Sequence, residues 1–208
     1  MVIEGMPATG AHRGTVFLDR DGTLIEDIGF LSRVDQVAFF PWTIDAIRVL
    51  NRAGLTTVVV TNQSGVARGH FDLASVEAVH THIAAVLAAG GARIDAYYYC
   101  PHHPDGSVAE FTRVCTCRKP ARGLVDQAGR DLGVDPERSF VVGDRWSDVA
   151  LARAIGGRGL LVRTGYGSVE EPNPPGALAA DIIADNLIGA VGWILMSLMA
   201  EDGAWSAC

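Results

Sequence analysis

The sequence has no long hydrophobic run. Residues 1–14 contain no continuous apolar segment, which argues against a signal peptide or an N-terminal membrane anchor. The most apolar stretch, 187–199, is too short to span a bilayer, and we expect a terminal helix that packs on the core. The sequence therefore predicts a cytoplasmic protein with no membrane partner.

Basic residues are also in short supply. The chain of 208 residues has 17 Lys and Arg against 24 Asp and Glu, for a net charge of −7. Nucleic-acid binding depends on a basic surface that neutralises phosphates, so we expect a small-molecule ligand and no nucleic acid. No coiled-coil pattern or obvious pairing surface is present, which favours a monomer.

The composition, 49% hydrophobic and 20% charged, suits a globular protein. Residues 1–208 are expected to form a single domain in which 1–13 are flexible. Apolar runs alternate with helical patterns, which predicts an α/β fold with a doubly wound parallel sheet. Strands are expected at 15–18, 56–61, 96–99, 140–143 and 159–162, and helices at 43–53, 73–89, 123–132 and 147–155.

Three stretches fit no regular element: 26–40, 65–71 and 100–120. We expect them to lie at the rim of the sheet, where loops carry function. No insertion is large enough to supply a separate cap domain, so these loops are expected to cover the ligand themselves.

Two aspartates at the end of the first predicted strand are the strongest chemical signal. Asp19 and Asp21 follow the run at 15–18, and Gly22 lets the backbone turn sharply. Ligands of open α/β sheets bind at this end of a strand, and alternate residues point to one side. A divalent cation would relieve the repulsion between the carboxylates. The alternative is an ordinary polar turn, since Asp and Gly are common in turns.

A second acidic group follows another predicted strand. The run 140–142 ends in Gly143 and Asp144. Asp144 is therefore expected to join Asp19 as a ligand of Mg²⁺, which prefers oxygen ligands. Asp148, one helical turn further on, either supports this metal site or interacts with the helix dipole.

The middle strand, 56–61, also ends in polar residues. Thr61, Asn62 and Gln63 offer hydroxyl, amide and backbone N–H groups that suit an anionic oxygen. Lys119 is added on chemical grounds, because a phosphoryl group between carboxylates needs a cation besides the metal. A solvated surface lysine is the ordinary alternative.

Three of the four cysteines lie in one predicted loop. Cys100, Cys115 and Cys117 accompany His102, and three thiolates with one imidazole form a standard tetrahedral zinc set. This set leaves no open position for water, so a structural zinc is expected to order loop 100–117. The alternative is a group of reduced surface thiols. His103 is either another ligand or a substrate-facing residue.

The order Asp-x-Asp, Thr, Lys and Gly-Asp resembles the haloacid dehalogenase superfamily. The resemblance implies a magnesium-dependent phosphohydrolase in which Asp19 attacks phosphorus, forming an aspartyl-phosphate, and Asp21 is general acid and base. It also implies that Mg²⁺ is held by the side chains of Asp19 and Asp144 and the main-chain carbonyl of Asp21. Thr61 and Lys119 would grip the transferred group.

The zinc-loop motifs, Cys-Pro-His and Cys-Thr-Cys-Arg-Lys-Pro, resemble two groups in this superfamily: the heptose bisphosphate phosphatases and the histidinol-phosphate phosphatases. Twelve residues separate His102 from Cys115, similar to the longer loop of the heptose enzymes. The resemblance thus implies removal of the 7-phosphate of D-glycero-D-manno-heptose 1,7-bisphosphate, with the heptose anomer left open. A histidinol-phosphate phosphatase is the alternative, and a non-catalytic sugar-phosphate-binding protein is less favoured.

The resemblance also implies which residues hold the substrate. These are Asn62, Gln63 and Arg118, with Arg68 as a further candidate. Arg145 is a departure, because the similar enzymes usually have lysine after Gly-Asp; the charge is kept but the point-like reach is lost.

Overall fold

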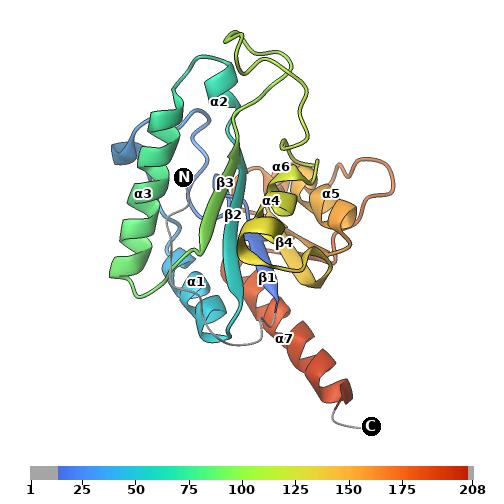
Figure 1. Cartoon of the computed structure of the whole chain (residues 1–208). Helices are drawn as coiled ribbons and strands as arrows, with labels where there is room; N and C mark the ends of the chain where they lie inside the picture. Colours follow the sequence, from blue (N-terminus) through green and yellow to red (C-terminus); the bar gives the residue numbers. More distant parts are fainter. Residues whose placement is uncertain (1–13, 206–208) are drawn as a thin grey trace.

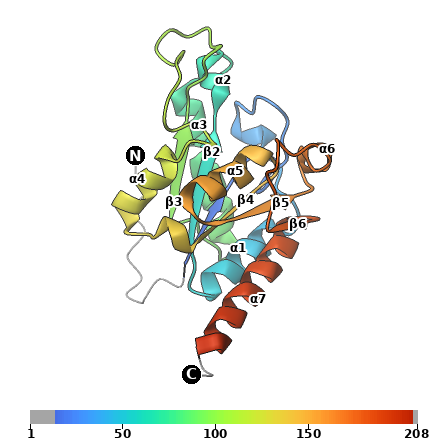
Figure 2. The same cartoon turned by 90° about the vertical axis from the view of Figure 1, so that its right-hand side faces the viewer.

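The computed structural model describes residues 14–205, with side chains up to Glu201. Residues 1–13, which we predicted to be flexible, and Cys208 lie outside this range. Six parallel strands form one sheet in the order β3-β2-β1-β4-β5-β6 (Figures 1 and 2). The predicted doubly wound parallel sheet is confirmed. The strands are β1 (Thr15–Leu18), β2 (Thr56–Asn62), β3 (Ala96–Cys100), β4 (Ser139–Gly143), β5 (Arg158–Val162) and β6 (Ile182–Ala184).

Seven α-helices connect or flank these strands in the described part of the chain. They are α1 (Thr43–Arg52), α2 (Ser64–Ala67), α3 (Leu73–Ala89), α4 (Gly123–Leu132), α5 (Trp146–Ile155), α6 (Gly167–Glu170) and α7 (Leu187–Trp205). Short 3-10 turns cover Val34–Gln36 and Pro136–Arg138.

The predicted elements are confirmed, with ends that differ by one residue at most for the first five strands. The terminal helix is longer than the predicted 187–199. The sequence missed β6 and α6, and the expectation that 65–71 contains no regular element is wrong at its start, since α2 extends to Ala67. Four-residue helices and three-residue strands are too short to display a periodic pattern.

Helix α3 shows how local chemistry sets an element's ends. The Asp72 side chain accepts a hydrogen bond of 2.8 Å from the backbone N–H of Ser75, which caps the first turn. The helix stops at Gly90, and Gly91 follows with φ of +72°, a conformation that suits glycine. Both ends match the prediction.

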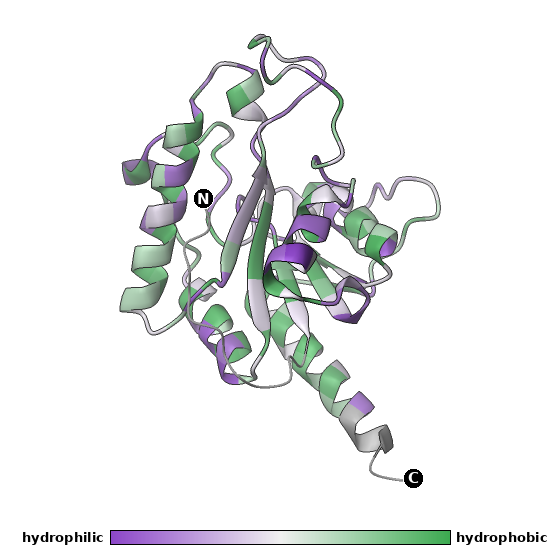
Figure 3. Ribbon diagram, viewed as in Figure 1, coloured by the Kyte–Doolittle hydropathy of each residue, from purple (hydrophilic) through white to green (hydrophobic). Residues whose placement is uncertain are grey.

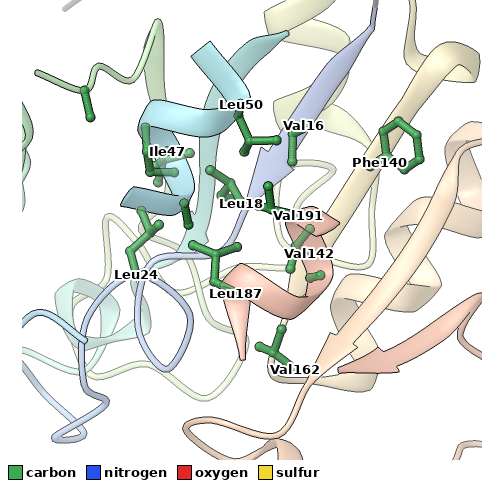
Figure 4. Close-up of a cluster of buried hydrophobic side chains, with 14 of the residues drawn as sticks. Val16, Leu18, Leu24, Ile47, Leu50, Phe140, Val142, Val162, Leu187 and Val191 are labelled. Atoms are coloured by element: carbon green, nitrogen blue, oxygen red, sulfur yellow. The ribbon is translucent and has the colours of Figure 1, made fainter. Parts of the chain in front are cut away.

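The sheet is covered on both faces. Because alternate side chains of β1 point in opposite directions, Val16 and Leu18 pack in one cluster with residues of α1 and α7 (Figure 4) and of α3. Phe17 packs on the other face, in a cluster with residues of α4 and α5. Each fully buried leucine or phenylalanine stabilises the fold by roughly 1.5–3 kcal/mol. In Figure 3 the middle of β2 is hydrophobic, whereas hydrophilic residues lie on α1 and α4.

The position of the site follows from the register of the strands. Leu18 pairs with Val59 on one side and with Val142 on the other, so β1, β2 and β4 finish side by side. The segments that follow β1, β2 and β3, residues 19–42, 63–72 and 101–122, gather at this end of the sheet (Figure 1). Residues 14–205 include no separate cap domain and, among their helices, none that is long and apolar enough to cross a membrane.

Candidate active site

The motif residues from four distant segments meet at the carboxyl end of the sheet. Asp19 follows β1, and its N–H continues the sheet by donating 2.9 Å to the Val142 carbonyl. A cavity of about 630 Å³ opens there, and its lining includes Asp19, Asp21, Thr61 and Lys119. The geometry brings together the groups that sequence analysis selected, and an ordinary polar turn does not account for this convergence.

Three carboxylates lie behind the cavity. One oxygen from each of Asp19, Asp144 and Asp148 lies within 4.8 Å of the others, and all three side chains are buried. Burial, followed by the charges of Asp19 and Asp148, raises the pKa of Asp144 to about 8. Asp144 Oδ2 accepts 2.8 Å from the N–H of Tyr166, but Oδ1 is buried without a hydrogen-bond partner. These residues fit a divalent cation, which would satisfy that oxygen and offset the like charges.

Glycine is required where the loop after β1 passes Asp144. Gly22 has φ of +79°, and a Cβ there would lie 2.2 Å from Asp144 Oδ2. Gly165 approaches the same oxygen, with a Cβ distance of 2.3 Å. Thr164 Oγ1 donates 2.6 Å to the Gly22 carbonyl and ties the two loops together. The sharp turn predicted at Gly22 is present, and it brings the backbone against the proposed metal ligand.

Lys119 is a buried residue and not a solvated one. Its Nζ lies 2.9 Å from Asp19 Oδ1 and 2.6 Å from Asp148 Oδ1. Burial acts to lower the pKa of Lys119, but the Asp148 and Asp19 carboxylates outweigh it and raise the pKa. Asp148 Oδ2 also accepts 3.2 Å from the N–H of Arg145. Asp148 therefore both caps the first turn of α5 and holds the lysine.

The polar end of β2 positions these groups. Asn62 Oδ1 accepts 2.9 Å from the N–H of Lys119, and its Nδ2 donates 3.2 Å to the Lys119 carbonyl. Gln63 Nε2 donates 2.9 Å to both Thr61 Oγ1 and Asp21 Oδ2. Both amide side chains thus contact candidate catalytic residues, and their predicted contact with substrate stays a prediction.

One rim of the cavity is basic. Arg68 Nη2 lies 3.2 Å from the ring Nε2 of His103, and Arg118 Nη1 lies 3.5 Å from the His102 carbonyl. Arg68, His103 and Arg118 all line the cavity. Burial, and then the two arginines, lower the pKa of His103. His103 is not part of the four-residue cysteine cluster and lines the cavity, so of the two alternatives the geometry favours the substrate-facing one, which stays a prediction.

The lining of the cavity also includes Arg145. The guanidinium carbon of Arg145 lies 3.9 Å from the ring centre of Tyr166, and its nitrogens lie 3.7 Å from Asp27 and 4.0 Å from Glu170. The three partners of Arg145 come from separate loops without a recognisable motif, so the sequence does not predict these contacts.

The cysteine loop forms a compact cluster. The sulfur of Cys117 lies 3.1 Å from that of Cys100 and 3.3 Å from that of Cys115, and 3.2 Å from His102 Nδ1. These separations exceed the ~2.05 Å of a disulfide and stay below the ~3.8 Å edges of a tetrahedral zinc–thiolate site. The hydrogen bond from Cys100 lowers the pKa of Cys117 to about 5. The four residues fit a zinc ion.

Two buried side chains behind Asp21, Arg20 and His80, carry no motif that predicts a role for them. Arg20 lies between the two aspartates and is only 1% exposed. Arginine is usually a surface residue, so no pattern marks a buried one. Arg20 contacts Asp21, and His80 contacts Arg20.

Comparison with known proteins agrees with this geometry. Residues 116–190 match the HAD-hydrolase-like family. The chain is 44% identical to a D-glycero-beta-D-manno-heptose-1,7-bisphosphate 7-phosphatase of Yersinia pestis over 174 residues, which covers 83% of this chain and 90% of the relative. The chain belongs to the heptose bisphosphate phosphatase family of HAD-like hydrolases.

Other members of this family are similar over nearly their whole length. A D-glycero-D-manno-heptose-1,7-bisphosphate 7-phosphatase of Thermosynechococcus vestitus is 40% identical, with 89% of this chain and 97% of the relative covered. The structure of D,D-heptose 1,7-bisphosphate phosphatase from B. bronchiseptica, complexed with magnesium and phosphate, superposes with a TM-score of 0.78 at 33% identity. That alignment covers 88% of this chain and 99% of the other. The resemblance stated from the motifs is confirmed.

Proposed function

We propose that the protein hydrolyses the 7-phosphate of D-glycero-D-manno-heptose 1,7-bisphosphate and leaves the 1-phosphate in place. The observation that carries the proposal is the meeting of Asp19, Asp21 and Lys119 at one cavity. The chain that forms this cavity shares 44% identity with a heptose bisphosphate phosphatase. The basic rim formed by Arg68 and Arg118 gives the cavity positive charge for the rest of an anionic sugar phosphate.

Asp19 is the proposed nucleophile. One carboxylate oxygen attacks the phosphorus at C7, the bond from phosphorus to the C7 oxygen breaks, and Asp21 gives a proton to that oxygen. The products of this step are the alcohol and an aspartyl-phosphate. Lys119, 2.9 Å from Asp19, stabilises the charge on the transferred group, and the Thr61 hydroxyl offers it a hydrogen bond.

Asp21 then works in the opposite direction. It takes a proton from a water molecule, and the water oxygen attacks the phosphorus of the aspartyl-phosphate. The bond from phosphorus to the Asp19 oxygen breaks, which returns the carboxylate and releases inorganic phosphate. A side chain that first gives and then takes a proton lets the enzyme release an alcohol whose unprotonated alkoxide would be a poor leaving group.

Both metals of the proposal have residues that fit them. Asp19 and Asp144, which lie close together in the structure, would hold Mg²⁺ with the main-chain carbonyl of Asp21 that the family resemblance implies, and the ion would supply positive charge to the phosphate oxygens. Cys100, His102, Cys115 and Cys117 would hold a structural zinc that orders the loop before Arg118 and Lys119. The proposal includes a monomeric enzyme in the cytoplasm, where cysteine thiols stay reduced.

The test is phosphate release, with Mg²⁺ present, from the α and β anomers of heptose 1,7-bisphosphate and from histidinol phosphate in parallel. The proposal expects a kcat/KM for one heptose anomer far above that for histidinol phosphate. Faster hydrolysis of histidinol phosphate would overturn the substrate assignment. The length of the cysteine loop and the names of the relatives both favour the heptose substrate over this alternative.

A further inference from the structure

The carboxylate of Asp21 is gripped by a buried arginine. Arg20 Nη2 lies 3.0 Å from Asp21 Oδ2, and Arg20 Nε donates to the same oxygen at 3.2 Å. The Arg20 side chain is 1% exposed, whereas that of Asp21 is 18% exposed and lines the cavity. Burying a guanidinium costs several kcal/mol unless its donors are matched, so the contacts of Arg20 are informative.

Two further residues fix the guanidinium. Arg20 Nη2 donates 2.9 Å to Gln63 Oε1, and Nη1 lies 3.3 Å from the ring Nε2 of His80 on α3. An arginine can only donate, so His80 must accept through Nε2. Burial, helped by the charge of Arg20, lowers the pKa of His80 to about 3, which keeps the ring neutral and able to accept.

The His80 ring is itself held in place. It stacks on Tyr97 with ring centres 5.0 Å apart and meets the edge of Tyr99 at 5.6 Å. Gln63 contacts both members of the ion pair, because its Oε1 accepts from Arg20 and its Nε2 donates 2.9 Å to Asp21 Oδ2. Asp21 therefore receives donors from Arg20 on both carboxylate oxygens and from Gln63 on Oδ2. The Arg20 guanidinium is held in turn by contacts with α3 and with the residue that follows β2.

We propose that Arg20 is a positioning residue for the general acid and base Asp21, and that neutral His80 orients the Arg20 guanidinium for this task. The inference rests on the proposed function in one respect, the role of Asp21. A carboxylate held at the cavity wall exchanges its proton with the leaving oxygen at little cost in reorganisation. A carboxylate freed from Arg20 rotates, and protonation of the leaving oxygen becomes slower.

This role has a signature that a structural role lacks. An alkyl phosphate needs a proton on its leaving oxygen, whereas p-nitrophenyl phosphate releases a stabilised phenolate and needs none. Loss of Asp21 positioning should therefore slow the alkyl ester and spare the aryl ester. General misfolding or loss of metal would slow both equally.

The experiment compares His80→Leu, which removes the acceptor, with His80→Gln, which keeps one. For His80→Leu we expect kcat on heptose 1,7-bisphosphate to fall about 10-fold, KM to change little, and kcat on p-nitrophenyl phosphate to fall less than about 2-fold. His80→Gln should recover most of the alkyl activity. His82→Leu, on the same helix and without a contact to Arg20, is the matched control and should leave the ratio of the two rates unchanged.

Arg20→Met provides a second test, with about a 100-fold loss expected on the alkyl ester and a much smaller loss on the aryl ester. Equal losses on both esters in variants that keep the wild-type melting temperature would overturn the proposal, as would full alkyl activity in His80→Leu. The wild-type rate on heptose bisphosphate tests the proposed function separately. If that substrate is inert, β-glycerophosphate replaces it as the alkyl ester, and the comparison with p-nitrophenyl phosphate decides the role of Arg20 alone.

Discussion

The ammonium group of Lys119 lies 2.6 Å from the carboxylate of Asp148, and both side chains are buried. The same ammonium lies 2.9 Å from Asp19, so one cation balances two carboxylates beside the cavity. A buried charge that loses its partner is strongly destabilising, even where the intact pair contributes little. This arrangement makes Lys119 part of both the chemistry and the stability of the site.

Lys119→Met should lower the free energy of unfolding by about 3–5 kcal/mol, because Asp148 and Asp19 lose their cation. Phosphatase activity should be lost as well. Adding Asp148→Asn to this variant should restore part of the stability but none of the activity. Urea unfolding measures the free energy of unfolding of both variants. A Lys119→Met protein as stable as the wild type would show that the ion pair is not formed.

Gly22→Ala should destabilise the protein and weaken Mg²⁺ binding. Its φ of +79° already costs an alanine about 1–2 kcal/mol, and its Cβ would lie 2.2 Å from Asp144 Oδ2. Gly54 is a matched control, since its φ is +75° and a Cβ there would meet nothing within 4 Å. Calorimetric titration with Mg²⁺ should show weaker binding for Gly22→Ala alone. Equal Mg²⁺ affinity of Gly22→Ala and Gly54→Ala would contradict the close approach of Gly22 to Asp144.

The metal-free protein should lose stability as pH rises from about 5 to 8. The folded state holds the pKa of Asp144 at about 8, above the ordinary 3.8, so in this window it binds a proton that the unfolded chain has released. Mg²⁺ should raise the melting temperature more at about pH 8 than at about pH 5.5, because it competes with that proton.

Asp144→Asn controls for the other titrating groups. Its melting temperature should depend less on pH, and Mg²⁺ should have little effect on it at either pH. If Mg²⁺ raised the melting temperature of the wild type equally at both pH values, proton and metal would not compete for this carboxylate.

Zinc removal should unfold the cysteine loop. Purified protein should contain about one zinc per chain, and Cys115→Ser should lower both the zinc content and the melting temperature, because three ligands hold the ion less firmly. Cys208→Ser, outside the described residues and outside the four-residue cluster, should keep its zinc. Atomic emission spectroscopy gives the metal content. A zinc-free wild type of normal activity would contradict a structural ion.

Much of this fold could be predicted from the sequence, because the hydrophobic periodicity and the residues that cap or stop each helix indicated the same elements. Helix α3 was predicted with both ends correct, since Asp72 caps it and Gly90 stops it. Strand β6, three residues long, offered no pattern. The segments that carry the motifs were also readable, because each follows a buried strand and strands end together.

The side-chain contacts within the site could not be predicted from the sequence. The sequence does not show whether the Asn62 side chain contacts substrate or the main chain of Lys119. In the structure its Oδ1 accepts 2.9 Å from the N–H of Lys119. Buried Arg20 and its partner His80 lie sixty positions apart, and only the packing of α3 against the sheet brings them into contact. Side-chain orientation depends on the whole fold, whereas motifs record only residue type and order.

The most direct test of the account is to identify which phosphate leaves heptose 1,7-bisphosphate, by ³¹P NMR of the reaction with Mg²⁺. The account predicts that the C7 phosphate signal is replaced by inorganic phosphate while the anomeric C1 phosphate signal persists, and that Asp19→Asn, folded and with its zinc, produces no change. Release of the C1 phosphate, or continued turnover by Asp19→Asn, would contradict it.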